Sequence, residues 1–324
     1  MNTHTSALTS SSARAALVNT KVLSLRKKGR HASSSSSSSG KQTKKQTMII
    51  KAVSNSVTPD NDWGESTQAV HNGERGGRPR ISDSLTTPIV CTSTYTFKDT
   101  KELIDYQEGN YGSFEYGRYG NPTTRAVEEK IRLLEGGDDC LLSASGMCTA
   151  VTMLLSLVPA GGHIVTTTDC YRRTRQFIQT FLPKMGITST VLDPSDYDGL
   201  QKALDEHDCS LYFSESPTNP YLRCVDIDRI SKMCKPKGCL VCIDGTFATP
   251  CNLKPLKFGA DLVIHSASKY MGGHNDVLAG VIVGQKEAVS KVRAFLNIVG
   301  GVLEPQAEYL ILRGLKTLSL RVER

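Results

Sequence analysis

The feature that most constrains the fold is a regular alternation of short apolar runs and longer amphipathic stretches, which extends from Cys140 to Val283. The apolar runs have the length and β-branched content of buried strands, and the stretches between them have the period of helices. Strands joined by helices run parallel in one sheet, with helices on both faces. The sequence therefore predicts an α/β domain with a mostly parallel sheet of the seven-stranded type, its strands expected at 140–143, 163–167, 187–192, 211–214, 239–243, 262–264 and 281–283.

Ligands of such folds collect at the carboxyl ends of the strands, and the most reactive group expected there is the amine of Lys269. It follows an apolar run and is flanked by Ser266 and Ser268, whose hydroxyls are suited to a phosphate. We expect this amine to be poorly hydrated and available to condense with an aldehyde. An aldehyde and a phosphate on one small molecule indicate pyridoxal 5′-phosphate. A serine-rich turn of this kind is more often only a solvated loop.

Other strand ends carry side chains that would complete such a site. Gly146 opens a helix whose first amides can seat a phosphate, and Tyr171 follows a strand where its ring could cover a planar cofactor. Asn219 stands in a proline-rich loop, and Asp244 ends a strand where it could pair with a ring nitrogen. Each also has a plainer explanation as a strand-to-helix turn, a packed ring or a helix cap. Together they predict one ligand site at one edge of the sheet.

A helix is predicted to begin at Asn121 and Pro122 and to stop at Gly136. Just before it, Tyr116 and Arg118 present a phenol and a guanidinium, which form a suitable pair for a phosphate dianion. An arginine beside a turn is more often a surface residue, so this pair adds to the prediction only in combination with the strand ends.

Residues 1–59 carry ten lysines and arginines, many serines and threonines, and no aspartate or glutamate. This composition cannot bury a core and matches an organelle transit peptide, with chloroplast favoured over mitochondrion because serine outweighs arginine. A disordered or RNA-binding tail is the alternative. Without the ten positive charges the net charge changes from +7 to −3, so the basic balance says little about nucleic acid. No apolar run reaches the ~18 residues of a membrane span.

The remaining chain divides into an arm at residues 60–120 and the α/β domain at residues 121–324. The arm has turn residues and a short β-prone patch at 92–97 but no long hydrophobic period. We expect it to contact a neighbouring subunit.

The ten cysteines are scattered without repeated spacing. In the one C-x-x-C, Cys239 and Cys242 fall in an expected strand, where residues three apart point to opposite faces and cannot readily clamp a zinc ion. We therefore predict reduced, structural cysteines in an intracellular, stroma-like compartment, and no metal site.

Six motifs, taken in chain order, resemble the Cys/Met-metabolism enzymes that use pyridoxal phosphate, with wording closest to the plant-type cystathionine γ-synthases. They are Tyr-Gly-Arg-Tyr-Gly-Asn-Pro-Thr, Ser-Gly-Met, Asp-Cys-Tyr, Glu-Ser-Pro-Thr-Asn-Pro, Asp-Gly-Thr-Phe-Ala-Thr-Pro and His-Ser-Ala-Ser-Lys-Tyr-Met-Gly-Gly-His. The match extends roughly from Val70 to Val322. The resemblance implies the large domain of a fold-type I pyridoxal-phosphate-dependent transferase.

The resemblance also implies roles for individual residues. Lys269 would hold the cofactor covalently and shuttle protons, Tyr171 would stack on the ring and help to deprotonate the incoming amine, and Asp244 would keep the ring nitrogen protonated. Asn219 would bind near the ring hydroxyl and the substrate carboxylate. The cofactor phosphate would be bound by Gly146, Met147, Ser266 and Ser268, joined by Tyr116 and Arg118 from the neighbouring subunit of a homodimer or homotetramer.

The implied activity is a γ-replacement that forms cystathionine from an activated homoserine ester and cysteine, the transsulfuration step towards methionine. This sequence departs from the family pattern at two places, and both limit what the resemblance implies about the activity. Family members continue for roughly another hundred residues into a smaller C-terminal domain, whereas this chain stops at Arg324, so we expect a truncated chain. Residues 107–112 contain no lysine or arginine, although plant-type relatives tend to carry basic residues there that could meet an ester's phosphate. The alternatives are a γ-lyase or homoserine-ester sulfhydrylase, and a truncated chain that only binds cofactor or oligomerises.

Overall fold

A computed structural model describes residues 63–71 and 84–324 of the chain. The predicted targeting segment at residues 1–59 lies outside the described residues, as does part of the predicted arm. Within the described ranges, no helix is both long enough and apolar enough to span a bilayer.

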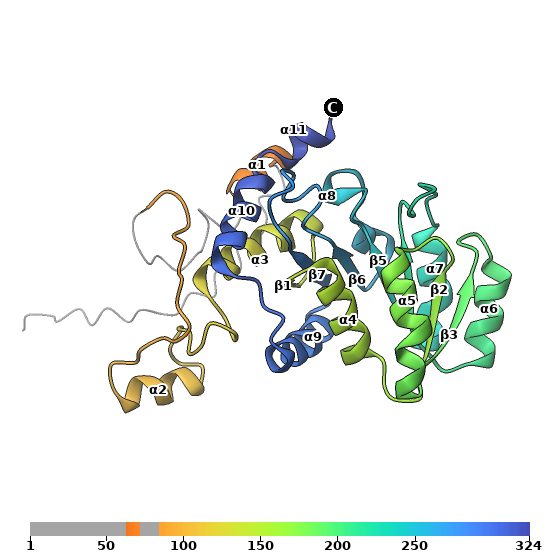
Figure 1. Cartoon of the computed structure of the whole chain (residues 1–324), viewed down its shortest axis with the longest axis horizontal. Coiled ribbons are helices and arrows are strands. Elements are labelled where there is room, and N and C mark those ends of the chain that lie inside the picture. The colour runs from red at the N-terminus through yellow and green to blue at the C-terminus, as the bar shows by residue number, and fades with distance from the viewer. Residues whose placement is uncertain (1–62, 72–83) are drawn as a thin grey trace, which may run out of the picture. The chain divides into compact units, whose positions relative to one another are not determined.

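A seven-stranded sheet with the order β1-β7-β6-β5-β4-β2-β3 forms the centre of the α/β domain (Figure 1). Neighbouring strands from β3 to β6 are parallel, whereas β7 is antiparallel to both β6 and β1. β1 therefore points in the same direction as β2 to β6, and the carboxyl ends of these strands meet at one edge. The predicted mostly parallel sheet is confirmed, with strands at Asp139–Ser143 (β1), His163–Thr167 (β2), Thr188–Leu192 (β3), Cys209–Glu215 (β4), Leu240–Asp244 (β5), Leu262–His265 (β6) and Gly280–Gly284 (β7).

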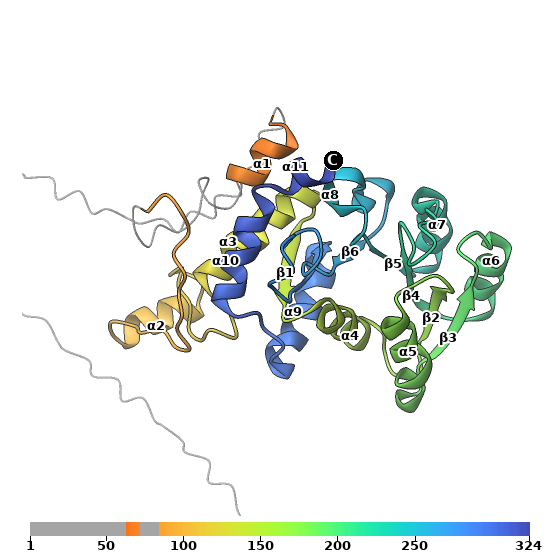
Figure 2. The same ribbon diagram turned by 45° about the horizontal axis from the view of Figure 1, so that its top comes forward.

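Helices cover both faces of this sheet, and Figure 2 shows β2, β3 and β4 between α5 on one side and α6 and α7 on the other. The apolar cluster on one face packs α4, α5 and α9 against the strands, and two further clusters on the opposite face pack α3 with α10 and α6 with α7. The long helices are α3 (Pro122–Glu135), α4 (Gly146–Leu157), α5 (Arg172–Thr180), α6 (Tyr197–Glu206), α7 (Ile227–Cys234), α9 (Lys286–Val299) and α10 (Pro305–Leu315).

Local sequence explains where these helices begin and end. For α3, the side-chain oxygen of Asn121 accepts a hydrogen bond from the amide of Thr123, and Pro122 occupies the first turn. The helix ends at Gly136, whose φ of 80° is a left-handed conformation that favours glycine. The predicted boundaries of this helix are confirmed.

The two cysteines of the C-x-x-C sequence lie on opposite faces of the sheet, as predicted. Cys242 packs in the cluster beneath α4 and α5, and Cys239 packs in the cluster beneath α6 and α7. All ten cysteines of the chain are free thiols in the structure.

The arm is more regular than predicted, because it contains α1 (Glu65–His71) and α2 (Thr100–Gln107). The β-prone patch at 92–97 forms only a single bridge, between Thr94 and Tyr116. α1 packs against α3, where the buried ammonium of Lys130 donates to the carbonyl of Ala69 at 2.7 Å. The remaining short elements are η1 (Leu182–Met185), η2 (Lys235–Lys237), α8 (Thr249–Asn252), η3 (Pro255–Phe258) and α11 (Leu318–Val322).

Candidate active site

The carboxyl edge of the sheet brings together the residues predicted at strand ends. β1, β2, β4, β5 and β6 all end there because they point in one direction. The side chains and amides that follow these strands belong to Gly146, Met147, Tyr171, Asn219, Asp244, Ser266, Ser268 and Lys269.

The N-terminus of α4 lies against the residue that follows β6. A Cβ atom on Gly146 would stand 2.8 Å from the Cβ of Ser266, so only glycine permits this approach. The side chain of Ser145 caps the helix by accepting from the amide of Cys148 at 3.0 Å. The amides of Gly146 and Met147 belong to the first turn, where helix geometry offers them no carbonyl partner. Amides that converge with a serine hydroxyl at a helix N-terminus fit a phosphate group.

Thr246 connects this phosphate seat to the next strand. Its hydroxyl accepts from the amide of Ser266 at 2.8 Å and donates to Oδ1 of Asp244 at 2.5 Å. Thr246 therefore fixes Ser266 relative to Asp244. Thr246 was not among the predicted site residues, although the hydroxyl in Asp-Gly-Thr, two residues after a strand-end carboxylate, could have indicated it.

The turn after β6 differs from expectation at Lys269, which is exposed. The expected burial of its amine is wrong, because β6 ends at His265 and the lysine stands four residues further along, at an exposed position of the turn. The hydroxyl of Ser268 donates to the carbonyl of Ala279 at 3.2 Å and accepts from the amide of Ala279 at 2.9 Å. Because a serine hydroxyl has one proton to donate, Ser268 must rotate before it can donate to a phosphate.

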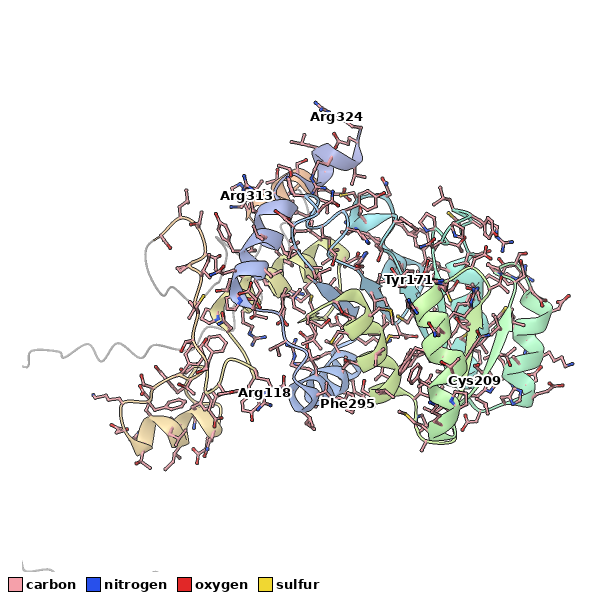
Figure 3. All side chains as sticks on the ribbon, in the orientation of Figure 1. Arg118, Tyr171, Cys209, Phe295, Arg313 and Arg324 are labelled. Carbon is pink, nitrogen blue, oxygen red and sulfur yellow. The ribbon has the colours of Figure 1, made fainter. Side chains whose placement is uncertain are left out.

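Tyr171 lies at the N-terminus of α5, at the carboxyl edge of the sheet, where Figure 3 labels it. Tyr171 is 45% exposed, so its ring can cover a flat ligand. Its amide donates to Oε1 of Glu215, and the backbone of Asn219 also bonds to this carboxylate. Glu215 is buried at the end of β4 and joins the Tyr171 and Asn219 loops. Glu215 opens the motif Glu-Ser-Pro-Thr-Asn-Pro but was not among the predicted site residues.

Glu215 and Asp244 form the electrostatic centre of this edge, because they are paired in register on neighbouring strands. Burial raises the pKa of Asp244, an effect that its hydrogen bonds to Thr246 only partly offset. Burial, and then the charge of Asp244, raise the pKa of Glu215 to about 8. A protonated pyridine nitrogen would place a positive charge beside these two carboxyl groups and would stabilise their ionised forms. The donors at Gly146 and this acidic pair thus fit the opposite ends of pyridoxal phosphate.

Within one chain, Tyr116 and Arg118 do not join this cluster. The guanidinium of Arg118 lies 5.2 Å from the ring centroid of Tyr116 and 4.8 Å from that of Tyr119, and it donates to the carbonyl of Asn297. Figure 3 shows Arg118 well separated from Tyr171.

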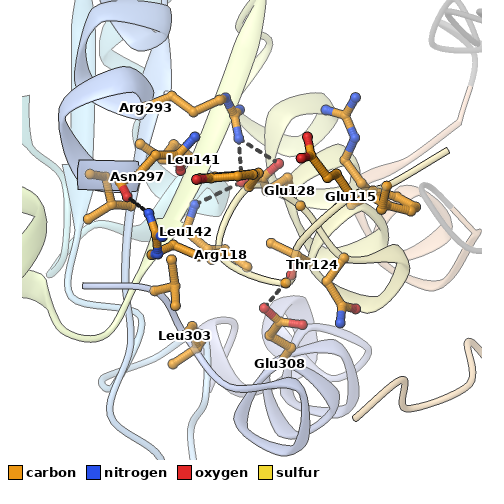
Figure 4. A pocket seen from close by; sticks show the side chains of 18 of the residues that line it. Glu115, Arg118, Thr124, Glu128, Leu141, Leu142, Arg293, Asn297, Leu303 and Glu308 are labelled. Carbon is orange, nitrogen blue, oxygen red and sulfur yellow. Dashed lines mark hydrogen bonds and ion pairs between the residues drawn. The ribbon is translucent and has the colours of Figure 1, made fainter. Parts of the chain in front are cut away.

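Arg118 instead lines a separate pocket between the arm, α3, α9 and α10 (Figure 4). The wall of this pocket includes Glu128, which is paired with Arg293 at 3.0 Å, and the fully buried Glu308. Glu308 accepts from the hydroxyl of Thr124 at 2.6 Å, and burial raises the pKa of its carboxyl to about 8. The pocket is thus distinct from the carboxyl edge where the strand-end residues meet.

Comparison with known proteins identifies the family. Residues 66–324 match the model of the Cys/Met metabolism PLP-dependent enzymes, and the chain belongs to this family. The chain is 62% identical over 260 residues to cystathionine gamma-synthase 1, chloroplastic, from Nicotiana tabacum, covering 80% of this chain and 48% of the relative. It is 39% identical over 258 residues to a cystathionine beta-lyase from Lactococcus lactis, covering 79% of this chain and 65% of the lyase.

Solved structures show the same fold. The crystal structure of metB from Corynebacterium glutamicum matches with a TM-score of 0.74 and 32% identity, over 80% of this chain and 65% of that chain. Cystathionine gamma-lyase from Lactobacillus plantarum, complexed with L-serine, matches with a TM-score of 0.71 and 35% identity, also over 80% and 65%. The chain spans about half the length of the plant relatives named cystathionine gamma-synthase 1.

Proposed function

We propose that this chain supplies the cofactor-binding part of a cystathionine γ-synthase, which forms cystathionine from an activated homoserine ester and cysteine on the path to methionine. The observation that carries the proposal is the joining of Gly146, Ser266, Lys269 and Asp244 at one sheet edge. The choice of reaction rests on the 56–62% identity to plant relatives with this name, against 37–39% for lyases.

The residues present would hold pyridoxal phosphate at both ends. The amides of Gly146 and Met147, with the hydroxyl of Ser266, would bind the phosphate, and Asp244 would face the ring nitrogen. The ring of Tyr171 would lie over the cofactor, and Asn219 would bind near its ring hydroxyl. Ser268 would contribute after rotating away from Ala279. When bound, the cofactor supplies an electron sink for bonds at the substrate Cα.

Side chains of the protein then transfer protons and orient the substrate. The Nζ of Lys269, exposed on its turn, moves the proton between the Cα and Cβ positions of the substrate. The phenol of Tyr171 takes a proton from the incoming amino group. Glu215 fixes Tyr171 through its amide and keeps the loop of Asn219 close to the ring, so that the substrate carboxylate meets an amide side chain.

The complete site would need a second subunit. Tyr116 and Arg118 stand away from the strand ends of their own chain, and the proposal places them at the phosphate of a neighbouring chain in a homodimer or homotetramer. The arm of residues 60–120 would make this crossing.

The proposed location is the plastid stroma, with residues 1–59 as the transit peptide. It is supported by the basic, acid-free composition of that segment and by two relatives whose names include the word chloroplastic.

A product assay tests the proposed reaction. The full chain, loaded with pyridoxal phosphate, is mixed with O-phospho-, O-succinyl- or O-acetylhomoserine in the presence of cysteine, and the products are separated by mass. We expect cystathionine. Ketobutyrate alone would instead indicate a γ-lyase, the second candidate, which the identity to named lyases favours. In a parallel reaction with sulfide in place of cysteine, homocysteine as the sole sulfur product of the two reactions would indicate a sulfhydrylase.

A further inference from the structure

The turn that carries Lys269 is closed by three backbone hydrogen bonds, and Ser268 attaches its first part to Ala279. The amide of Lys269 donates to the carbonyl of Ser266 at 3.0 Å, and the amide of Gly273 donates back to the carbonyl of Lys269 at 2.7 Å. The amide of Gly272 donates to the carbonyl of Ala267 at 2.8 Å. These bonds define a compact turn but do not attach its outer side, where Lys269 and Tyr270 are exposed, to the rest of the domain.

The C-terminal helices supply that attachment. α10 packs so closely on the turn that a Cβ atom on Gly314 would stand 2.4 Å from the carbonyl oxygens of both Met271 and Gly272. Real Cβ atoms do not approach a carbonyl oxygen this closely, so residue 314 must be glycine. The backbone of α10 therefore supports the turn directly from behind.

Arg321 of α11 completes this support with three hydrogen bonds from one guanidinium. Nη1 donates to the carbonyl of Tyr270 at 2.7 Å, Nη2 to the carbonyl of Gly314 at 2.8 Å, and Nε to the hydroxyl of Thr317 at 3.1 Å. A planar fork presents donors from three separate nitrogen atoms to these three groups, whereas an ammonium donates from a single nitrogen. The guanidinium thus ties the end of α10, the start of α11 and the lysine turn together.

The turn is shaped to receive this side chain. A Cβ atom on Gly273 would lie 2.4 Å from the guanidinium carbon of Arg321, and the φ of Gly273 is 78°, in the left-handed region that favours glycine. A side chain at this position would have to displace the guanidinium of Arg321, and the left-handed conformation also favours glycine where the turn closes.

We propose that Arg321 is a positioning residue for Lys269. By holding the carbonyl of the next residue, Tyr270, it fixes the direction in which the lysine side chain leaves the turn, towards the phosphate seat at Gly146 and Ser266. This inference rests on the proposed cofactor role of Lys269. It concerns the bond between Lys269 and the cofactor, because the guanidinium of Arg321 bonds to Tyr270, Gly314 and Thr317 and to none of the residues proposed to bind the cofactor.

Two ligands separate positioning of Lys269 from general support of the fold. Pyridoxal 5′-phosphate binds both through its phosphate and through condensation with the lysine, whereas pyridoxine 5′-phosphate has the same ring and phosphate but no aldehyde to condense. A residue that positions only the lysine affects the first ligand, and a residue that supports the whole pocket affects both.

The variants are Arg321→Gln, Arg321→Lys and a matched control, Arg313→Gln, on the exposed side of α10 (Figure 3). Binding of each ligand to the full chain is measured by calorimetry, and the covalent fraction is measured by borohydride reduction and mass. For Arg321→Gln we expect the apparent Kd of pyridoxal phosphate to rise about tenfold while that of pyridoxine phosphate changes less than about twofold. Arg321→Lys should recover part of the loss, and Arg313→Gln should behave as the parent.

Equal losses for both ligands in Arg321→Gln, or no loss for either, would overturn the proposal. A second measurement does not depend on the cofactor. Hydrogen exchange of the amides of Gly272 and Gly273 in the cofactor-free chain should become at least about tenfold faster in Arg321→Gln, because the turn loses its outer attachment. Unchanged exchange would contradict the hold of Arg321 on the turn. If the parent chain does not bind pyridoxal phosphate at all, the proposed function fails. The hydrogen-exchange experiment alone then decides whether Arg321 holds the turn.

Discussion

Glu215 and Asp244 are paired in register at the ends of two neighbouring parallel strands. Both groups have a raised pKa, through burial in each case, and the charge of Asp244 raises the pKa of Glu215 further, to about 8. The edge of the sheet thus carries concentrated acidity next to donors at the end of α4. This polarity gives the candidate site a direction, with one end suited to an anion and the other to a cation.

Replacing Asp244 by asparagine tests the acidic end. Because the ring nitrogen would lose its charged partner, we expect turnover to fall about 100-fold while the cofactor remains covalently bound. The pKa of Glu215 should also fall, since one of the two main causes of its rise is removed. Steady-state rates measure the turnover, and the visible absorbance shows whether the cofactor remains bound. Asp198→Asn, an exposed change on α6, is the control, and full activity in Asp244→Asn would contradict the assigned role.

The phosphate end is tested by Gly146→Ala. The added methyl group would overlap the side chain of Ser266, so the seat must widen, and we expect the Kd of pyridoxal phosphate to rise about tenfold. Gly64→Ala is a matched control because a Cβ atom there has no neighbour within 4 Å. Absorbance titration gives both affinities, and equal affinities in the two variants would argue against a phosphate seat at Gly146.

Glu308 should make stability depend on pH. Its pKa is raised from 4.5 in the unfolded chain to about 8 in the folded one, so between these values the folded state binds the additional proton. The free energy of unfolding therefore falls as pH rises from about 4.5 through 8. Glu308→Gln stays neutral and can still accept from Thr124, so its decline should be shallower and its stability at about pH 9 higher by more than about 1 kcal/mol. Urea denaturation across pH measures this, with the exposed Glu287→Gln as control. Parallel curves for parent and Glu308→Gln would show that the carboxyl ionises normally.

Sharing of the site between subunits predicts complementation. Lys269→Ala and Arg118→Gln chains should each be inactive alone, because one lacks the lysine and the other lacks the donor that crosses. When the two are unfolded and refolded together, random pairing gives mixed dimers with one intact site, and on the order of a quarter of the parent's activity should return. A mixture without any recovered activity would indicate that Arg118 serves only its own chain, where it contacts Asn297.

Much of the fold could be predicted from sequence because each buried strand has its own apolar run. β2, for example, begins at His163 and ends at Thr167, as expected. α3 was equally clear, since its cap, its first-turn proline and its terminal glycine are all local signals.

The elements that were missed depend on contacts distant in sequence. α1 is held by a bond from Lys130, 61 residues beyond Ala69, which no local pattern reveals. α2 buries no residue, so it has no apolar stripe, and only the cap at Asp99 marked its start. In the site, the strand-end residues followed from topology, but Thr246 and Glu215 act through bonds to other loops. The contact of Arg321 with the lysine turn spans 51 residues and required the structure.

The central claim is that Lys269 holds the cofactor, and one measurement tests it most directly. The chain is loaded with pyridoxal phosphate, reduced with borohydride and digested, and the modified peptide is located by mass spectrometry. We predict one modified residue, Lys269, with the label absent in Lys269→Ala and retained in Lys257→Ala, an exposed lysine of η3. A label on another lysine, or one that persists in Lys269→Ala, would contradict the account.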